Sequence, residues 1–329
     1  PWDIDKVLYE FGLPMGPFQM GDLAGVDIGG TKISALLVTD SGRVLARGTV
    51  PAPAHEGGAA MADAAAGLVR SLADRLETTV RAVGAGAAGV IDARGTVIAA
   101  SDTFHDWAGF PLADELSARL GVPAVAVNDV NAFLLGEAAW GAVRGSDVLG
   151  VMLGTGVGGA LLLDGALRGG PHGGAGEIGH TPGYSDIVCT CGRVGHLETV
   201  AAGRSIARAY REATEGLGIG NEGGPDGGAA ALTARDVADL ARAGDPAARA
   251  AYDAAGRALA KACVSAATLL DLPAVVVGGG VAQAWDLLQP AIDDVLRTDP
   301  PVSGAPLTIS RGTLGGDAVA LGAAASTAG

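Results

Sequence analysis

The sequence predicts an α/β protein of two related lobes, each with a mixed sheet covered by helices. Apolar strand segments joined by glycine turns alternate with longer segments of helical periodicity. Residues 150–165 repeat the strand, glycine turn and strand of residues 25–42, so that Gly154 corresponds to Gly29. A supersecondary unit that occurs twice indicates a duplicated architecture.

The predicted elements of the first half begin at Gly25. Residues 25–42 are expected to form two strands around a glycine turn, because apolar residues dominate both arms and glycine permits a tight bend. Strands and helices then alternate. A strand, a helix, a strand, a helix, a short strand and a helix are expected at residues 43–50, 59–77, 82–88, 112–120, 124–127 and 130–141.

The second half is richer in helices. Helices are expected at residues 201–215, 233–243, 246–270 and 282–297, with a buried strand at 274–277 and a surface loop at 216–229. The last helix, residues 315–325, cannot be placed from periodicity alone.

The composition is that of a globular protein. The 329 residues are 49% hydrophobic and 18% charged, enough for a substantial core and for two domains. With 22 basic against 36 acidic side chains, the formal charge of −14 disfavours nucleic acid or an anionic membrane as the main partner. Neither a signal peptide nor an apolar run of spanning length is found, and the cysteines suggest no disulfide framework. We therefore expect a cytoplasmic protein.

The feature with the most chemical content is a cluster of metal-ligand residues. Cys189 and Cys191 are separated by one residue and lie between His180 and His196. Together they offer the four sulfur and nitrogen ligands of a closed tetrahedral zinc site. Two carboxylates flank the cluster without being obvious ligands. The pattern predicts a loop held by a structural metal, so the function must be read from what the loop is placed against.

Two glycine turns have the character of phosphate-binding loops. In Gly29-Gly30-Thr31-Lys32 the glycines bring backbone N–H groups toward an anion, and Lys32 adds a point charge. Asp27, two residues earlier, is placed to hold a magnesium-bound water. One such turn could be an ordinary hairpin. A second, Gly154-Thr155-Gly156, at the equivalent place in the repeat favours two turns that clamp a polyphosphate.

Two further strand ends are candidate functional sites. Gly278-Gly279-Gly280 follows an all-valine strand and opens a helix, which suits the phosphate or adenosine of a nucleotide, although such strand ends are common. Asn128-Asp129 ends another apolar strand and opens the next helix. One interpretation is a helix N-cap. The other makes Asp129 the general base for a hydroxyl that attacks a phosphoryl group.

Taken together, these motifs carry a resemblance to one family. They occur in the order Asp27-Ile-Gly-Gly-Thr-Lys32, Asn128-Asp129 followed by Asn131, Leu153-Gly-Thr-Gly156, Gly176-Glu-Ile-Gly-His180, Cys189-Thr-Cys-Gly-Arg-Val-Gly-His-Leu-Glu198 and Val277-Gly-Gly-Gly280. In this order they resemble the ROK family of sugar kinases, over about residues 25–329. The combination of motifs is highly specific.

The resemblance implies a fold and a reaction. The fold is the actin-like ATPase fold, a duplicated ribonuclease H-like fold with two lobes around a cleft. A small lobe (25–127 with 312–329) and a large lobe with the zinc-binding loop (128–311) would follow an extension of unclear role (1–24). The reaction implied is transfer of the γ-phosphate of ATP to the 6-hydroxyl of glucose, with magnesium, a structural zinc ion and a homodimeric enzyme.

The resemblance also assigns roles to residues. Asp129 would be the catalytic base. The sugar would be held by Asp102, Asn128, Asp129, Glu177, His180 and Glu198, and zinc by His180, Cys189, Cys191 and His196. His180 would thus use one ring nitrogen for zinc and the other for the sugar. Phosphates would lie on Gly29, Gly30, Thr31, Lys32, Gly154, Thr155 and Gly156, with Asp27 in the same cofactor site, and adenosine near Gly278, Gly279 and Gly280.

Three departures from the family pattern matter. His196 stands where the family usually has cysteine, and since histidine is a competent zinc ligand we expect binding to survive. Asp102 stands where sugar-binding members usually have asparagine, and an aspartate accepts hydrogen bonds from hydroxyls but donates none. Residues 3–25 do not resemble the family. They resemble part of the C-terminal domain of 3-hydroxyacyl-CoA dehydrogenases, without enough of it for dehydrogenase activity.

Several alternatives remain open. The sugar could be N-acetylmannosamine, N-acetylglucosamine, fructose or allose, and the donor could be polyphosphate. A non-catalytic sugar-binding protein is a different class. So is a transcriptional repressor of the same fold, but that would need an N-terminal helix-turn-helix of about sixty residues. Only 24 residues precede Gly25, and the chain is acidic, so we expect no nucleic-acid partner.

Overall fold

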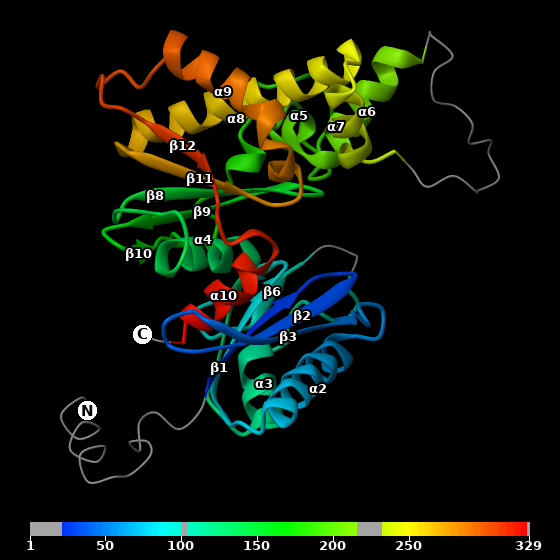
Figure 1. The fold of residues 1–329 in the computed structure, drawn as a ribbon, viewed down its shortest axis with the longest axis vertical. Coiled ribbons are helices and arrows are strands. Elements are labelled where there is room, and N and C mark those ends of the chain that lie inside the picture. The colour runs from blue at the N-terminus through cyan, green and yellow to red at the C-terminus, as the bar shows by residue number, and fades with distance from the viewer. Residues whose placement is uncertain (1–21, 101–103, 216–231, 328–329) are drawn as a thin grey trace. The chain divides into compact units, whose positions relative to one another are not determined.

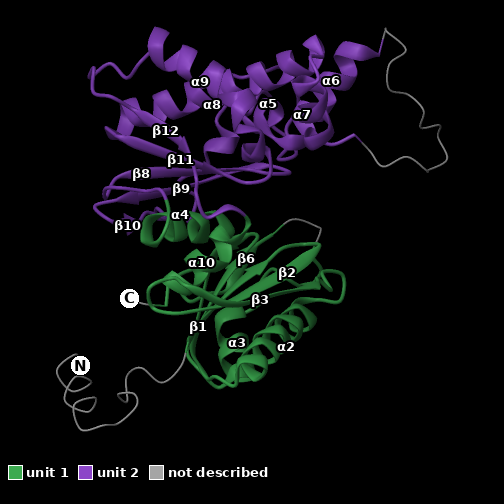
Figure 2. Ribbon diagram, viewed as in Figure 1, with its two compact units in different colours: residues 1–141, 316–329 green, residues 142–315 purple. Residues whose placement is uncertain are grey.

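The computed structural model describes residues 22–100, 104–215 and 232–327. These residues form two compact units, coloured separately in Figure 2. Unit 1 contains the described residues up to Gly141 and those from Gly316 onward, and unit 2 spans Ala142–Gly315. Each unit has its own five-stranded sheet and its own hydrophobic core.

The sheet of unit 1 has the order β3-β2-β1-β4-β7. β1, β2 and β3 form an antiparallel meander, and β4 and β7 continue the sheet parallel to β1. The strands are β1 Asp22–Ile28, β2 Lys32–Val38, β3 Val44–Pro51, β4 Val80–Ala87 and β7 Ala124–Asn128, and a separate hairpin pairs β5 Val90–Ile91 with β6 Val97–Ala99.

Helices cover both faces of this sheet (Figure 1). They are α2 Gly58–Leu76 and α3 Leu112–Leu120 on one face, α10 Ala318–Ala325 on the other, and α4 Asp129–Ala139 packed on α10. Side chains alternate along a strand. Val26 and Ile28 therefore enter the core beneath α2 and α3, whereas Gly25 points to α10, where a Cβ would lie 1.8 Å from the Ala320 carbonyl oxygen.

The sheet of unit 2 has the order β10-β9-β8-β11-β12, with the same pattern of antiparallel and parallel neighbours. The strands are β8 Val148–Leu153, β9 Val157–Leu163, β10 Ala166–Leu167, β11 Ala274–Gly278 and β12 Thr308–Arg311. Since the two sheets share their strand order, the duplication predicted from the glycine turns is confirmed.

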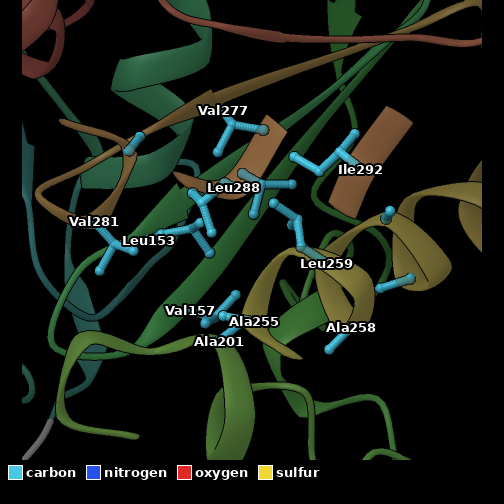
Figure 3. Close-up of a cluster of buried hydrophobic side chains, with 14 of the residues drawn as sticks. Leu153, Val157, Ala201, Ala255, Ala258, Leu259, Val277, Val281, Leu288 and Ile292 are labelled. Atoms are coloured by element: carbon cyan, nitrogen blue, oxygen red, sulfur yellow. The ribbon is translucent and has the colours of Figure 1, made fainter. Parts of the chain in front are cut away.

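Among the described residues, unit 2 has more helical residues than unit 1. Its helices are α5 Glu198–Ala201, α6 Gly203–Thr214, α7 Ala234–Arg242, α8 Pro246–Leu270 and α9 Trp285–Thr298, with 3₁₀ turns η1 Ile178–His180 and η2 Val281–Ala284. In the core shown in Figure 3, Leu153 and Val277 of the sheet pack with Leu259 of α8 and Leu288 of α9. No helix in the described parts of the chain combines the length and apolarity needed to cross a bilayer.

Some predicted boundaries differ from the structure. The helix expected at 201–215 is α6 and begins at Gly203, because the extended backbone of Ala202 (φ −71°, ψ 153°) separates it from the short helix α5. The helix expected from residue 282 begins at Trp285, after η2. The first strand starts at Asp22 rather than Gly25. The loop at 216–229 lies outside the described residues.

The border between the units also differs from the predicted border between lobes, at 127/128 and 311/312. The structure assigns α4 to unit 1, so that unit 2 begins at Ala142 and ends at Gly315. The physical reason is the close packing of α4 on α10, where a Cβ on Gly322 would lie 1.6 Å from the Ala132 carbonyl oxygen. The sequence pattern of α4 alone does not show that contact.

Candidate active site and metal centre

The first glycine turn joins β1 to β2 in unit 1. The Gly29 N–H donates to the Lys32 carbonyl oxygen (3.1 Å), and the Thr31 carbonyl oxygen accepts from the Ala52 N–H (3.0 Å). These backbone bonds hold the turn, while the side chains of Thr31 and Lys32 are exposed. A hydrogen-bonded turn with an exposed lysine is suited to anion binding.

Asn128 is the N-cap of α4. Its Oδ1 accepts from the Val130 and Asn131 N–H groups (2.9 and 3.2 Å), and its Nδ2 donates to the Gly89 carbonyl oxygen (2.9 Å). These bonds use both lone pairs of Oδ1, so towards a ligand the amide can only donate. Of the two roles open at this dipeptide, the capping role belongs to Asn128, and Asp129 is the first residue of α4.

Asp27 and Asp129 influence each other electrostatically. Burial, followed by the negative charge of Asp129, raises the pKa of Asp27 from 3.8 to about 6, although Lys32 acts in the opposite direction. A carboxyl group that titrates near neutrality, beside a second carboxylate and a lysine, is a common arrangement at sites that bind cations or transfer protons. Unit 1 therefore places Asp27, Lys32 and Asp129 in one electrostatic group.

The second glycine turn, between β8 and β9, lies in unit 2. The Gly154 N–H donates to the Gly156 carbonyl oxygen (2.9 Å), and the Gly154 carbonyl oxygen accepts from the Gly203 N–H at the start of α6 (2.9 Å). A Cβ on Gly156 would lie 2.4 Å from Oε2 of Glu198, so this glycine is needed for the carboxylate to approach. The turn is thereby tied to both α6 and Glu198.

A cavity of about 1010 Å³ opens beside this turn within unit 2. Its lining combines apolar groups with Thr155 and Gly280 and with polar side chains that no sequence pattern had indicated, among them Arg204, Asp239 and Gln283. A large concave site with a few polar groups suits a small organic ligand such as a nucleoside. The lining residues come from distant parts of the chain, so only folding gathers them.

The glycine cluster 278–280 is divided by the fold. Gly280 lines the cavity, whereas Gly278 ends β11. Gly279 has φ 88°, and a Cβ there would lie 2.4 Å from the Leu153 carbonyl oxygen. This glycine is therefore explained by backbone packing.

The four predicted metal ligands converge in unit 2. One ligand atom from each of His180, Cys189, Cys191 and His196 lies within 4.8 Å of all the others. The Cys189 Sγ is 3.9 Å from the Nδ1 of His180, and the Cys191 Sγ is 3.2 Å from the Nδ1 of His196.

This geometry fits a tetrahedral ion. Zn–S and Zn–N bonds of about 2.3 and 2.0–2.1 Å imply ligand separations of about 3.3–3.8 Å, close to these distances. The backbone prepares the loop, since the Gly192 N–H donates to the Cys189 carbonyl oxygen (2.8 Å) and a β-bridge joins Val188 to Val194. The replacement of the family's usual cysteine by His196 leaves four donors in place.

The ring of His180 faces two groups. Its Nδ1 lies in the cysteine cluster, and its Nε2 is 3.9 Å from the Oε2 of Glu177. One nitrogen can therefore bind a metal while the other points to a carboxylate, the arrangement that fixes a histidine ring in many metal sites. Both His180 and Glu177 retain considerable side-chain exposure, at 39% and 52%.

Glu198, a predicted sugar ligand, is buried and hydrogen-bonded within its own chain. It is 6% exposed, and its Oε2 accepts from the Val157 N–H (3.0 Å). Its Oε1 accepts from Thr190 (3.0 Å), from Arg204 and from the Cys189 thiol (3.5 Å). Burial alone would raise the pKa of Glu198, but these hydrogen bonds and Arg204 outweigh it and the net shift is downward.

The remaining predicted residue, Asp102, lies outside the described residues, as does the extension up to residue 21. Cys263, which carries no predicted role, is buried in α8.

Comparison with known proteins identifies the family to which the chain belongs. The model of the ROK family matches residues 23–328. A glucokinase of Streptomyces coelicolor is 37% identical over 279 residues, which cover 82% of this chain and 85% of that protein. An N-acetylmannosamine kinase of Escherichia coli is 32% identical over 268 residues, covering 79% and 83%.

Solved structures agree. A ROK family glucokinase from Streptomyces griseus, in complex with glucose and AMPPNP, has a TM-score of 0.77 and 34% identity, with 92% of this chain and 98% of that chain covered. The fold is thus the actin-like ATPase fold, and the protein is a sugar kinase. The chain belongs to the ROK family. The family match begins at Leu23, and these comparisons do not support the dehydrogenase resemblance of residues 3–25.

Proposed function

We propose that this sugar kinase is a glucokinase, which transfers the γ-phosphoryl group of ATP to the 6-hydroxyl of glucose. The observation that carries the proposal is the likeness, at 37% and 34% identity, to a glucokinase and to a glucokinase structure with glucose and AMPPNP. The cavity beside Gly280 is assigned to the adenosine and the two glycine turns to the phosphates.

Asp129 is proposed as the general base. It accepts the proton of the sugar hydroxyl while the hydroxyl oxygen attacks the γ-phosphorus. Asn128 holds the start of α4 and so fixes the backbone of Asp129. Lys32 and the N–H groups of the glycine turns stabilise the negative charge on the phosphates. Positioning of the reactants and electrostatic stabilisation would therefore supply most of the rate enhancement. A magnesium ion, held through water by Asp27, would offset charge on the β- and γ-phosphates.

The sugar is assigned to Asp102, Asn128, Glu177, His180 and Glu198, in addition to Asp129. Since the amide of Asn128 can only donate, it would bind a hydroxyl oxygen, while the glutamates accept from hydroxyl hydrogens. Zinc on the cluster of His180, Cys189, Cys191 and His196 would fix the ring of His180 and the loop that carries Glu177.

A homodimer in the cytoplasm, acting at the entry of glucose into glycolysis, is the state we propose. Size-exclusion chromatography with light scattering tests the assembly, because a mass of one chain at micromolar concentration would contradict a dimer.

The direct test is turnover. ADP release with magnesium and ATP is measured over glucose, mannose, fructose, N-acetylglucosamine and N-acetylmannosamine, with polyphosphate as an alternative donor. The highest kcat/KM is expected with glucose and ATP. A preference for N-acetylmannosamine would establish the second candidate, which the similarity to the Escherichia coli kinase supports. Sugar binding in calorimetry without turnover would contradict both.

Asp129→Asn tests the assigned base. The amide keeps the size of the side chain but cannot take a proton, so kcat should fall by about 10²–10⁴-fold while glucose binding remains measurable. Asp74→Asn, an exposed residue of α2, is the matched control and should keep full activity. An Asp129→Asn enzyme with near-normal kcat would refute this role.

A further inference from the structure

Arg204 stands between two sites that the proposed function treats separately. It is the second residue of α6, and its side chain lines the cavity assigned to the nucleotide, together with Gly154 and Thr155 of the phosphate turn. The same guanidinium donates to the Oε1 of Glu198 and to the Oγ1 of Thr190 (3.2 Å). Thr190 lies between the two cysteines of the metal cluster.

In this state Glu198 is fully engaged by donors from its own chain. Its Oε2 is bound by the Val157 N–H, directly after the phosphate turn, and its Oε1 by Arg204, Thr190 and Cys189. With zinc bound, Cys189 would be a thiolate without a proton to donate, which leaves Thr190 and Arg204 as the donors to Oε1. Arg204 is the cation of the two, and charge-assisted hydrogen bonds are stronger than neutral ones. A sugar hydroxyl that needs Oε1 must therefore compete with Arg204.

Arg204 is also the more exposed partner of the pair. Its side chain is 42% exposed, whereas that of Glu198 is 8% exposed. A phosphate group bound in the cavity could replace the carboxylate as the anionic hydrogen-bond acceptor of the guanidinium, because the planar fork of arginine donors matches both carboxylates and phosphates.

We propose that Arg204 is a positioning residue that couples the nucleotide cavity to the sugar: a bound nucleotide draws the guanidinium away from Glu198, and the released Oε1 then accepts from a sugar hydroxyl. This inference rests on the proposed function, and it makes a statement beyond it. Bound nucleotide should lower the Kd for the sugar. By thermodynamic reciprocity, bound sugar should lower the Kd for the nucleotide by the same factor.

The test measures that factor. Glucose is titrated calorimetrically into the full chain, with and without saturating AMPPNP, and zinc content is determined for every sample. In the unsubstituted protein AMPPNP should lower the Kd for glucose by about fivefold or more. In Arg204→Gln the ratio of the two Kd values should fall below about twofold, because Oε1 no longer has to be released.

Arg211→Gln is the matched control. Arg211 is an exposed arginine of the same helix and lies outside the described lining of the cavity, so this variant should keep the coupling. A merely structural role of Arg204 would alter the Kd for glucose equally with and without AMPPNP and leave the ratio unchanged, which would overturn the proposal.

If Arg204→Gln does not fold, the unsubstituted protein by itself still tests whether nucleotide and sugar binding are coupled. Glucose that is bound and phosphorylated with a Kd that AMPPNP does not change would overturn the coupling and leave the proposed function standing. A protein that neither binds nor phosphorylates any sugar of the panel would overturn the proposed function, and the coupling with it.

Discussion

At the scale of single residues, Asp27 gives the protein a measurable dependence on pH. Its pKa is raised from 3.8 to about 6 by burial and by Asp129, against the effect of Lys32. Because the folded-state pKa is the higher one, folding favours the protonated form. The resulting stabilisation is present below about pH 4 and is lost as pH rises through 6, on the order of 2–3 kcal/mol in total.

Asp27→Asn should remove this component. The free energy of unfolding in urea, measured from pH 4 to pH 7, should decline less steeply in the variant than in the unsubstituted protein. Asp74→Asn, which changes an exposed carboxylate of α2, provides the control and should leave the profile unchanged. Parallel profiles for Asp27→Asn and the unsubstituted protein would contradict the assigned pKa.

Removal of a single predicted zinc ligand tests the metal centre. Cys191→Ser removes one of four clustered donors, so zinc measured by mass spectrometry should fall from one equivalent toward zero at low zinc concentration. Glucose binding should weaken more than AMPPNP binding, since the loop carries Glu177 and His180. Cys263→Ala, which removes a buried thiol of α8 elsewhere in unit 2, should keep the metal. Full zinc occupancy in Cys191→Ser would show that the ligand set is wrong.

At the scale of elements, the packing of α10 against α4 depends on glycine. A Cβ on Gly322 would lie 1.6 Å from the Ala132 carbonyl oxygen, so Gly322→Ala must push the helices apart. We expect a loss of about 3 kcal/mol or more in the free energy of unfolding. A Cβ on Gly67 in α2 would meet no atom of the described residues within 4 Å, and Gly67→Ala should stabilise by about 0.5–1 kcal/mol.

Both substitutions are Gly→Ala in helices of unit 1. Opposite changes in the free energy of unfolding would therefore separate the effect of helix packing from that of helix propensity. Both values come from urea unfolding monitored by circular dichroism. A Gly322→Ala variant as stable as the unsubstituted protein would mean that the helices can separate without loss, contrary to the close contact of their backbones.

At the scale of the whole molecule, two separate cores predict that a ligand protects the unit that binds it. The cavity is lined by residues of unit 2 alone. AMPPNP at a hundred times its Kd should stabilise the binding state by about 2.7 kcal/mol, and amide hydrogen exchange should slow most in α6, α7 and η2. Unchanged exchange in these three elements, with nucleotide bound, would place the nucleotide elsewhere.

The sequence by itself determined the elements and most of the candidate site residues. The periodicity of α8, the strands around both glycine turns and the duplication follow from local pattern, because alternation and glycine act over a few residues. The spacing of His180, Cys189, Cys191 and His196 was enough to predict a cluster that the fold then brings together.

Only the tertiary structure decided which partners these residues meet. No local pattern places α10 beside α4, shows that Gly279 serves backbone packing, or gathers Arg204 and Gln283 around one cavity. The same holds for Glu198, a predicted sugar ligand whose burial and contact with Arg204 no local pattern shows. Burial and long-range contacts set the charge and the accessibility of a side chain, and neither is encoded in its sequence neighbours.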